Sequence, residues 1–355
     1  MALISVCIPA YNRATQLGQL LDSILSQSFQ DYEILIAEDG SPERERIKAV
    51  FNLYDLKFPG RIRYCENETN LGYDGNLRRL IELSRGQYVL FMGNDDLLAP
   101  SALEAVATVI RKNPDVGVVL RSYSSFTTDP QQPKQIFRYF DQDRYFPPGS
   151  DTIVTFFRRC VFISGMVFKR DSALACSTKE FDGTLLYQQH LAGHVLARES
   201  GVYLNQIMSY HRLGGVPDFG SSAAEKGFFV PKRQTPDSSV HFMRGMLTIA
   251  NSLDEQPGVL VGKRILRDIG NYSYPILSIQ ADQPKAVFIR YLMQLARLGF
   301  WKVPLFYLYS AGLLTLGKSR CDALIALIKR SMGRAPILGR VYAGEVRKSS
   351  EESHS

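Results

Sequence analysis

Two adjacent acids follow a short apolar run in the first third of the chain. The run Tyr88–Met92 ends at Gly93, and Asn94, Asp95 and Asp96 come next. A short apolar run bounded by turn residues predicts a buried strand, and ligands of open α/β sheets collect at the carboxyl ends of such strands. Two neighbouring carboxylates repel each other unless a cation neutralises them, and Mg²⁺ or Mn²⁺ prefers carboxylate and phosphate oxygens. The pattern therefore indicates a metal-assisted site for a nucleotide diphosphate, with a solvated turn that caps the next helix as the alternative.

Strands and helices alternate around these acids. A second acidic pair, Glu38 and Asp39, also follows an apolar run and also precedes a turn. Strands that alternate with helices predict βαβ units and a mostly parallel sheet flanked by helices. The predicted strands are residues 3–9, 32–37, 61–66, 88–92 and 116–120; the predicted helices are one that opens at Asn12 or Thr15 and runs to Leu25, then 43–54, 76–84 and 101–111.

Composition narrows the class of protein. The chain has 355 residues, 45% hydrophobic and 22% charged, as expected for a globular protein with a sizeable core. The five cysteines are scattered and lack CxxC spacing, which indicates reduced thiols and no zinc site. The glycines form neither GxGxxG nor GxxxxGKS, so both common phosphate-binding fingerprints are missing. The chain lacks a basic leader at its start and an apolar run of roughly 18 residues, which predicts a cytoplasmic protein.

The positive charge is concentrated in the C-terminal part. Residues 258–348 hold 15 Lys and Arg against 4 Asp and Glu, whereas the whole chain has a formal net charge of +7. Helical spacing continues from about residue 238, and aromatic residues gather in 300–309 beside basic residues. Because amphipathic helices of this kind insert at anionic membrane surfaces, we predict peripheral membrane contact through residues 285–335. A helical subdomain packed on the sheet and an oligomer contact are the alternatives. A nucleic-acid partner is not expected, because the aromatics lie in apolar helical runs.

Four short motifs, in this order and spacing, resemble those of family 2 glycosyltransferases with the GT-A fold. They are SVCIPAYNR at 5–13, EDGS at 38–41, NLG at 70–72 followed by SRGQY at 84–88, and NDD at 94–96. The resemblance covers residues 3–120. More narrowly, GNDD at 93–96 and NLGYDGN at 70–76 are similar to bacterial O-antigen transferases of the abequosyltransferase type. The resemblance implies a GT-A, Rossmann-like α/β fold.

The resemblance also implies a role for each matching residue. It implies that a nucleotide sugar is bound by Pro9, Ala10, Tyr11, Arg13, Glu38, Asp39, Asn70, Gly72, Asp74 and Asn94. It implies that a divalent cation, Mn²⁺ or Mg²⁺, is bound by Asp95 and Asp96. The chemistry is coherent, because the Tyr11 ring can stack on a base and the Asp39 carboxylate can accept from ribose hydroxyls or a pyrimidine N–H. A metal at Asp95 would offset the charge on the leaving diphosphate. Packing of Tyr11 at a strand end and a turn role for Asp39 are the structural alternatives.

One position departs from the family pattern. The resemblance puts the first acid of the family's DxD at Gly93, so the metal site would contain fewer protein carboxylates. Either the metal binds weakly, through Asp95 and phosphate oxygens, or it is partly dispensable.

The acceptor half departs from the pattern as well. The resemblance implies a catalytic Glu-Asp pair about 20 residues after the strand 163–168, and Gln188-Gln189 stands there instead. An amide cannot act as a general base. Asp182 or His190 is the candidate base. The base could also lie elsewhere, at Asp218 for instance, or the reaction could proceed with retention. A helix-cap role for Asp182 and a packed imidazole for His190 are the structural alternatives, and the Gly- and Ser-rich residues 214–222 are either a lid or an ordinary loop.

These observations predict a modular organisation and one activity. Residues 1–235 would form the GT-A domain, with a nucleotide-sugar half at 1–120 and an acceptor half at 121–235; residues 236–348 would be helical and 349–355 disordered. The predicted activity is a nucleotide-sugar-dependent glycosyltransferase of hexosyltransferase type. It would act on a saccharide acceptor, lipid-linked, in bacterial O-antigen-like polysaccharide synthesis at the inner face of the cell membrane. The alternatives are a catalytically silent sugar-nucleotide-binding or scaffold protein, and a nucleotidyltransferase, which would need a triphosphate loop that PAYNRATQ does not resemble. The oligomeric state stays open.

Overall fold

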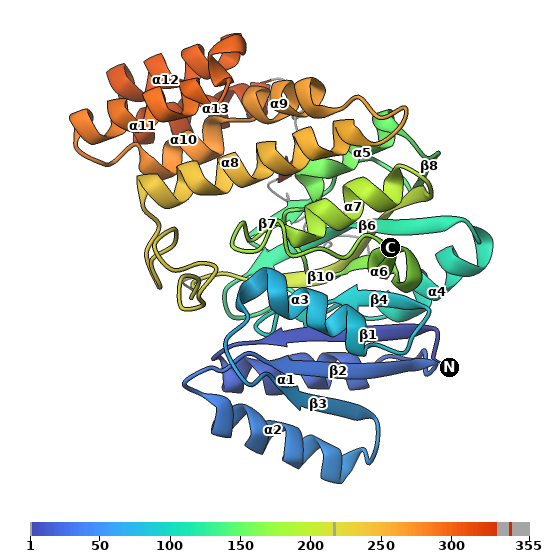
Figure 1. The fold of residues 1–355 in the computed structure, drawn as a ribbon. Coiled ribbons are helices and arrows are strands. Elements are labelled where there is room, and N and C mark those ends of the chain that lie inside the picture. Colours follow the sequence, from blue (N-terminus) through green and yellow to red (C-terminus); the bar gives the residue numbers. More distant parts are fainter. Residues whose placement is uncertain (1, 216–217, 332–340, 343–355) are drawn as a thin grey trace, which may run out of the picture.

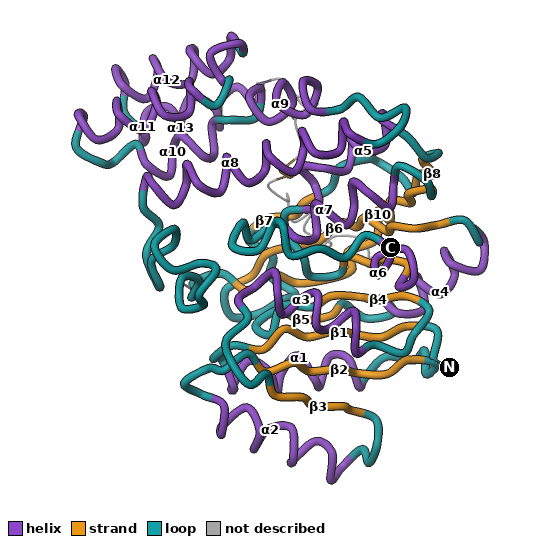
Figure 2. Tube along the Cα trace, viewed as in Figure 1, coloured by secondary structure: helices purple, strands orange, loops and turns teal. Residues whose placement is uncertain are grey.

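The computed structural model describes residues 2–215, 218–331 and 341–342. Within these residues eleven strands form one mixed sheet, which helices cover and which further helices extend at one end (Figure 1, Figure 2). The strands are β1 (Ile4–Ala10), β2 (Tyr32–Glu38), β3 (Ile62–Glu66), β4 (Tyr88–Phe91), β5 (Leu97–Leu98), β6 (Val116–Phe126), β7 (Gln135–Phe137), β8 (Arg144–Phe146), β9 (Met166–Lys169), β10 (Ser200–Arg212) and β11 (Val341–Tyr342).

The described helices fall into two groups. Those among the strands are α1 (Ala14–Leu25), α2 (Arg44–Lys57), α3 (Gly72–Leu83), α4 (Ala102–Lys112), α5 (Ser150–Phe157), the 3₁₀ turn η1 (Arg158–Cys160), α6 (Arg170–Ala175) and α7 (Tyr187–Leu196). Those that follow β10 are α8 (Pro236–Ser252), η2 (Leu253–Glu255), α9 (Gly262–Asn271), α10 (Tyr274–Gln280), α11 (Lys285–Arg297), η3 (Phe300–Lys302), α12 (Pro304–Leu316) and α13 (Lys318–Ser331).

The sheet brings the ends of distant strands to one edge. β3, β2, β1 and β4 lie side by side in that order and run parallel. β9 is antiparallel and joins β4 to β6, which pairs in parallel with β10. The carboxyl ends of β1, β2 and β4 therefore open at a common edge, where ligands of open α/β sheets bind. The predicted α/β class with a mostly parallel sheet is confirmed.

A core lies on each face of the sheet, which explains why the parallel strands are apolar along their whole length. One core packs α1, α2 and α4 against β1 and β2, with Leu17, Leu20, Leu21 and Ile24 forming the buried stripe of α1. The other core packs α3, α5 and α7 against the opposite face and continues into α8 and the helices after it. Each face is thus covered by amphipathic helices.

The predicted strands and helices are present, with two notable differences in length. β6 was expected to end at residue 120 but continues to Phe126. Its polar residues are buried. Arg121 donates to the carbonyls of Ser164 and Phe162, and the Ser122 hydroxyl bonds that of Tyr203, whereas the Ser124 hydroxyl has no hydrogen-bond partner among the described residues. The apolar run 153–162 also predicts a helix; this helix begins earlier, at Ser150, and passes into a 3₁₀ turn at Arg158.

The C-terminal helices stack on the β10 side of the molecule (Figure 1). Phe288, Tyr291, Leu295, Phe300 and Phe306 are buried in the same core as α7 and α8. Packing on the main body therefore accounts for one face of these helices, as one of the alternatives anticipated. Among the described residues, no helix combines the length and the apolar composition that crossing a bilayer requires. The division at residue 235 stays a prediction, and the tail 349–355 lies outside the described residues.

Candidate functional site

A cavity of about 260 Å³ opens at the edge where β1, β2 and β4 end. Nine of the predicted site residues line it: Pro9, Tyr11, Arg13, Asp39, Asn70, Gly72, Asn94, Asp95 and Asp96. They are joined by Tyr73, Asn76, Gly93, Phe162, Ile163, His211, Arg212, Gly215, Asp218, Phe219, Ser221 and Glu225. We call this space the donor cavity.

Asp39 lies on one wall of the donor cavity, directly after β2. Its Oδ1 accepts hydrogen bonds from the Asn67 side chain and the Leu71 backbone N–H, both at 2.8 Å. The carboxyl is 4% exposed, and this burial raises its pKa to about 6 although the two hydrogen bonds act in the opposite direction. Because both donors bind Oδ1, Oδ2 remains for a hydrogen-bond donor of a ligand.

The first turn of α3 forms the next part of the wall. Gly72 has φ +76°, and its N–H donates to Oδ1 of Asn70 at 2.9 Å. A Cβ at Gly72 would lie 2.5 Å from the Ser222 hydroxyl and 2.8 Å from Oε1 of Glu225. Glu225 in turn accepts from the backbone N–H of Tyr73 at 2.7 Å and from that of Gly220 at 2.8 Å. Glycine is required at Gly72 because its position is left-handed and the segment 220–225 packs directly on it.

Arg13 and Asp95 form an ion pair on the cavity wall. Arg13 has φ +63° and follows another left-handed residue, Asn12, which sends the chain sharply from β1 into α1. The Arg13 guanidinium donates to Oδ2 of Asp95 at 2.5 Å, and Asn94 fixes the turn by donating to the Asn12 carbonyl at 2.8 Å. Burial and the neighbouring Asp96 raise the pKa of Asp95, while Arg13 lowers it. The pair puts a guanidinium and a carboxylate side by side on the cavity wall.

Asp96 is held on both of its oxygens. Oδ2 accepts from the Ser164 hydroxyl, and Oδ1 accepts from the Arg212 backbone N–H at 3.0 Å and bonds Nδ1 of His211 at 3.1 Å. Burial lowers the pKa of His211, but the hydrogen bond and charge of Asp96 more than offset this and raise it. Since Nδ1 faces Asp96, Nε2 of His211 is the nitrogen left for another partner.

Ser164 also explains why glycine stands at residue 93. Its hydroxyl accepts the Gly93 N–H at 2.9 Å while donating to Asp96. A Cβ at Gly93 would lie 3.1 Å from Asp96 and 3.2 Å from the Ser164 hydroxyl. A longer side chain at this position would therefore crowd the contact between Ser164 and Asp96.

Few side chains of the donor cavity are available to coordinate a divalent cation. The described residues contain no group of three or more His, Cys, Asp or Glu side chains placed to hold a metal ion. Asp96 is occupied by protein donors, which leaves the free oxygen of Asp95 and Nε2 of His211. Mg²⁺ is often bound by one or two carboxylates plus substrate phosphates. The residues therefore fit a cation that a diphosphate helps to hold.

Three predicted nucleotide-binding residues lie outside the donor cavity. Ala10 is completely buried at the end of β1. Glu38 turns away from the cavity: its oxygens accept from the N–H groups of Gly40 and Ser41 and pair with Arg44. The structure therefore corrects the predicted ligand contacts of Ala10 and Glu38.

Asp74 is the third of these residues. It is 1% exposed, and its carboxylate accepts the backbone N–H groups of Gly183, Leu185 and Tyr187, each at 2.9 Å. Burial raises its pKa to about 7 although these hydrogen bonds lower it. Asp74 holds the loop before α7 rather than a ligand, which corrects the predicted role.

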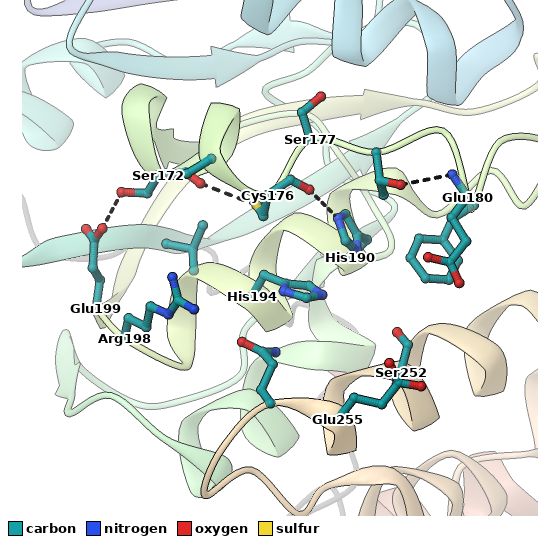
Figure 3. A pocket seen from close by; sticks show the side chains of 15 residues that line it. Ser172, Cys176, Ser177, Glu180, His190, His194, Arg198, Glu199, Ser252 and Glu255 are labelled. Carbon is teal, nitrogen blue, oxygen red and sulfur yellow. Dashed lines mark hydrogen bonds between the residues drawn. The ribbon is translucent and has the colours of Figure 1, made fainter.

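Asp182 and His190 do not reach the donor cavity either. Asp182 forms a two-point ion pair with Arg78, at 2.6 and 2.8 Å. His190 lines a separate pocket of about 420 Å³ together with His194 and Cys176, where its Nε2 bonds the Cys176 carbonyl (Figure 3). Burial lowers the pKa values of both histidines, that of His194 to about 4. The geometry does not support either predicted base.

The amides at the expected base position are structural. Gln188 donates to the Val161 carbonyl at 2.8 Å and accepts from the Tyr73 hydroxyl at 3.2 Å. Gln189 donates to the Phe157 carbonyl at 2.7 Å. Asp218, the other base considered, does line the donor cavity and accepts a hydrogen bond from Asn12 at 3.1 Å.

Several lining residues were not predicted from the sequence. They are Tyr73, Phe162, Ile163, His211, Arg212, Phe219 and Glu225. The position of His211 and Arg212 at the end of a strand was the available signal, because polar residues there gather with those of neighbouring strands. Of the predicted lid 214–222, residues 216–217 lie outside the described residues, while Gly215, Asp218 and Ser221 line the donor cavity.

Comparison with known proteins finds similarity to a family of glycosyltransferases. Residues 5–169 match the sequence profile of glycosyl transferase family 2. The chain is 32% identical over 185 residues to the abequosyltransferase RfbV of Salmonella typhimurium, which covers 51% of this chain and 54% of RfbV. The chain spans about half, or less, of the length of the curated relatives that it matches.

Solved structures show the same fold. TarS 1–349 of S. aureus in complex with UDP-GlcNAc superposes with a TM-score of 0.51 and 14% identity, over 95% of this chain and 93% of that one. The mannosyltransferase PcManGT of Pyrobaculum calidifontis, in complex with GDP-Man and Mn²⁺, superposes with a TM-score of 0.51 and 14% identity, over 94% and 88%. These similarities identify the fold as GT-A.

Proposed function

This protein carries a glycosyl transferase family 2 domain on a GT-A fold, and we propose that it transfers a sugar from a nucleotide-diphosphate sugar to a saccharide acceptor. The observation that carries the proposal is that Asp39, Arg13 and Asp95 line one cavity at the carboxyl edge of the sheet. Asp39 would bind the nucleoside through Oδ2, and Tyr11 would flank the base. Arg13 would face the diphosphate, whose charge a guanidinium matches. Asn70 and Gly72 would border the nucleoside from α3.

A divalent cation fits the same arrangement. Asp95 and His211 would hold it together with the diphosphate, and when bound it would neutralise charge on the departing phosphate. The structural neighbour in complex with GDP-Man and Mn²⁺ supports this expectation. Asp96 would position His211 rather than bind the metal, since its oxygens are taken by protein donors.

We assign the general base to Asp218. Asp39, Asp96 and Glu225 each accept at least two hydrogen bonds from the protein. Among the described residues Asp218 accepts one, from Asn12, and Asp95 accepts one, from Arg13. Because we place Asp95 at the cation, Asp218 is the carboxylate left for the acceptor. The acceptor hydroxyl would attack the anomeric carbon and give its proton to Asp218. The bond to the diphosphate oxygen would break, and its electron pair would leave with the nucleotide diphosphate.

The acceptor belongs, in this proposal, to lipid-linked intermediates of an O-antigen-like polysaccharide. The similarity to RfbV supports it. So does an exposed apolar surface on the C-terminal helices, which we define as Trp301, Tyr307, Leu308, Leu324 and Leu327, from 47 to 64% exposed. Aromatic and aliphatic side chains beside lysines and arginines suit an anionic membrane face. The enzyme would then work at the inner face of the cell membrane.

Calorimetry with UDP, GDP, CDP and dTDP, with and without Mn²⁺, tests the donor site. We expect one nucleotide to bind, and Asp39→Asn and Asp95→Ala each to weaken it at least tenfold. Asp171→Asn, at a side chain 89% exposed, is the matched control. If none of the four nucleotides binds, the proposal fails.

Turnover separates the catalytic assignments. With the donor and acceptor identified, Asp218→Asn should lower kcat by 100-fold or more and leave nucleotide affinity unchanged. Full activity of this variant would exclude Asp218 as the base and favour a retaining reaction. Nucleotide binding without turnover on any acceptor would favour the silent sugar-nucleotide-binding protein.

A further inference from the structure

A second cavity, of about 380 Å³, adjoins the donor cavity. The two share Gly215 and Phe219 as lining residues. The second cavity lies where the segment before α8 meets α8 and α10, on the side of the molecule where the yellow chain leaves β10 (Figure 1). The two cavities are therefore neighbours, with Gly215 and Phe219 at their common border.

The walls of the second cavity are mostly apolar. Phe242 and Met243 come from α8, Ile276 and Ile279 from α10, and Phe229 and Val230 from the preceding segment. Val230 is 47% exposed and Ile279 is 44% exposed, so large apolar side chains line its rim and meet water. A hydrocarbon chain that covers these walls removes apolar surface from water, which is favourable. The hydroxyls of a bare saccharide would instead lose hydrogen bonds to water there.

One charged side chain lines this apolar space. Arg233 lines the cavity and is exposed to water. The described residues that line the cavity include no carboxylate. A guanidinium favours a phosphate group, which it can bind through two N–H donors. The cavity thus combines apolar walls with one guanidinium that can bind phosphate, and it adjoins the proposed site of sugar transfer.

We propose that this cavity binds the hydrocarbon chain of an acceptor whose saccharide is joined to that chain through phosphate. This inference rests on the proposed function and specifies its acceptor. The saccharide would lie near Gly215 and Phe219, facing the donor cavity. The phosphate would lie at Arg233, and a prenyl or acyl chain would lie between α8 and α10. The enzyme then selects its acceptor by the lipid as well as by the sugar.

Calorimetry with three phosphate compounds tests the proposal: inorganic phosphate, which has no hydrocarbon chain, isopentenyl phosphate, which has a short one, and farnesyl phosphate, which has a long one. Each is used below the concentration at which it would form micelles. We expect farnesyl phosphate to bind at least tenfold more tightly than isopentenyl phosphate, and inorganic phosphate to bind most weakly. Ile279→Glu puts a carboxylate at the exposed rim and should weaken farnesyl phosphate at least tenfold. Arg233→Gln should weaken all three phosphates by a similar factor.

The control for a nonspecific effect of new charge is Leu260→Glu. Leu260 is 74% exposed and lies outside both cavities, so this variant should bind farnesyl phosphate as the wild type does. Thermal unfolding midpoints of the variants verify that each one is folded. Affinity that does not depend on chain length, or that survives Ile279→Glu, overturns the proposal. So does farnesyl phosphate binding that a nucleotide diphosphate abolishes by direct competition, because the phosphate would then occupy the donor cavity.

Nucleotide binding by the wild type distinguishes the two levels of inference. If a nucleotide diphosphate binds but chain length has no effect, the lipid pocket is refuted and the transferase proposal stands. If no nucleotide diphosphate binds, the transferase proposal fails, and tight farnesyl phosphate binding would then describe a lipid-binding protein of another function.

Discussion

Replacing Asp39 with asparagine should make the protein more stable while it removes nucleotide binding. Asp39 is 4% exposed, and burial raises its pKa from 3.8 to about 6. An asparagine keeps an oxygen for the hydrogen bonds from Asn67 and Leu71 and removes the buried charge. It also loses the carboxylate that would accept the donor groups of a nucleoside. A residue kept for function at the expense of stability is a common trade-off.

The size and direction of the effect follow from proton linkage. Because the folded pKa exceeds the unfolded one, folding takes up protons, and the contribution of Asp39 to stability is full below pH 3.8 and is lost as pH rises through about 6. At pH 8 the buried carboxylate destabilises the fold by about 3 kcal/mol. The gain in free energy of unfolding from Asp39→Asn should therefore approach about 3 kcal/mol at pH 8 and shrink to about 1 kcal/mol at pH 4.5.

Urea unfolding of both proteins at pH 4.5, 6 and 8 measures this gain, and calorimetry measures the loss of nucleotide affinity. Asp171→Asn, at an exposed carboxyl, should change stability by less than about 0.5 kcal/mol at every pH. An Asp39→Asn variant less stable than wild type at pH 8 would refute the linkage explanation, because the carboxylate would then stabilise the fold. An equal gain at all three pH values would also refute it, since the effect would not arise from ionisation.

Three further changes test other parts of the structure. Gly72→Ala puts a methyl group 2.5 Å from the Ser222 hydroxyl, at a backbone position with φ +76°. The variant should therefore lose about 1 kcal/mol or more of folding stability, and calorimetry should show nucleotide binding weakened at least tenfold. An unchanged Kd would show that the segment packed on α3 does not shape the donor cavity. Asp74→Ala leaves three buried backbone N–H groups without their acceptor and should lower the free energy of unfolding in urea by about 3 kcal/mol or more; a loss below about 1 kcal/mol would mean that water replaces the carboxylate. Serine at both Trp301 and Leu308 should reduce flotation with anionic vesicles several-fold, and undiminished flotation would locate membrane contact elsewhere.

The edge of the sheet was predictable because each buried parallel strand is a continuous apolar run that ends in polar turn residues. The sequence pattern alone therefore put Asp39 and Asp95 at one edge, where both line the donor cavity. The direction of each side chain was harder to predict. Glu38 and Asp39 are neighbours at the end of a strand, and successive strand residues point to opposite sides. Alternation implies that only one of the pair faces the cavity but does not say which one, and the structure shows that Glu38 turns away.

Other residues depend on contacts between segments far apart in sequence, which local patterns do not encode. His211 reaches Asp96 because β10 pairs antiparallel with β5, a register that sets Tyr210 opposite Leu97 and therefore His211 beside Asp96. Glu225 reaches the backbone of Tyr73 across 152 positions of sequence. The buried polar residues of β6 ended the predicted strand early for the same reason, since their partners Ser164 and Tyr203 come from later parts of the chain.

The first turn of α3 connects the donor cavity to α7. Gly72 and Tyr73 line the donor cavity and hold Glu225, whereas the next residue, Asp74, holds the loop that begins α7. The Tyr73 hydroxyl also bonds Gln188 on α7. Three consecutive residues of one turn thus fix the wall of the donor cavity relative to α7. Because a well-packed turn does not deform continuously, a change at Asp74 should alter nucleotide affinity as well as stability, although Asp74 itself lies outside the donor cavity.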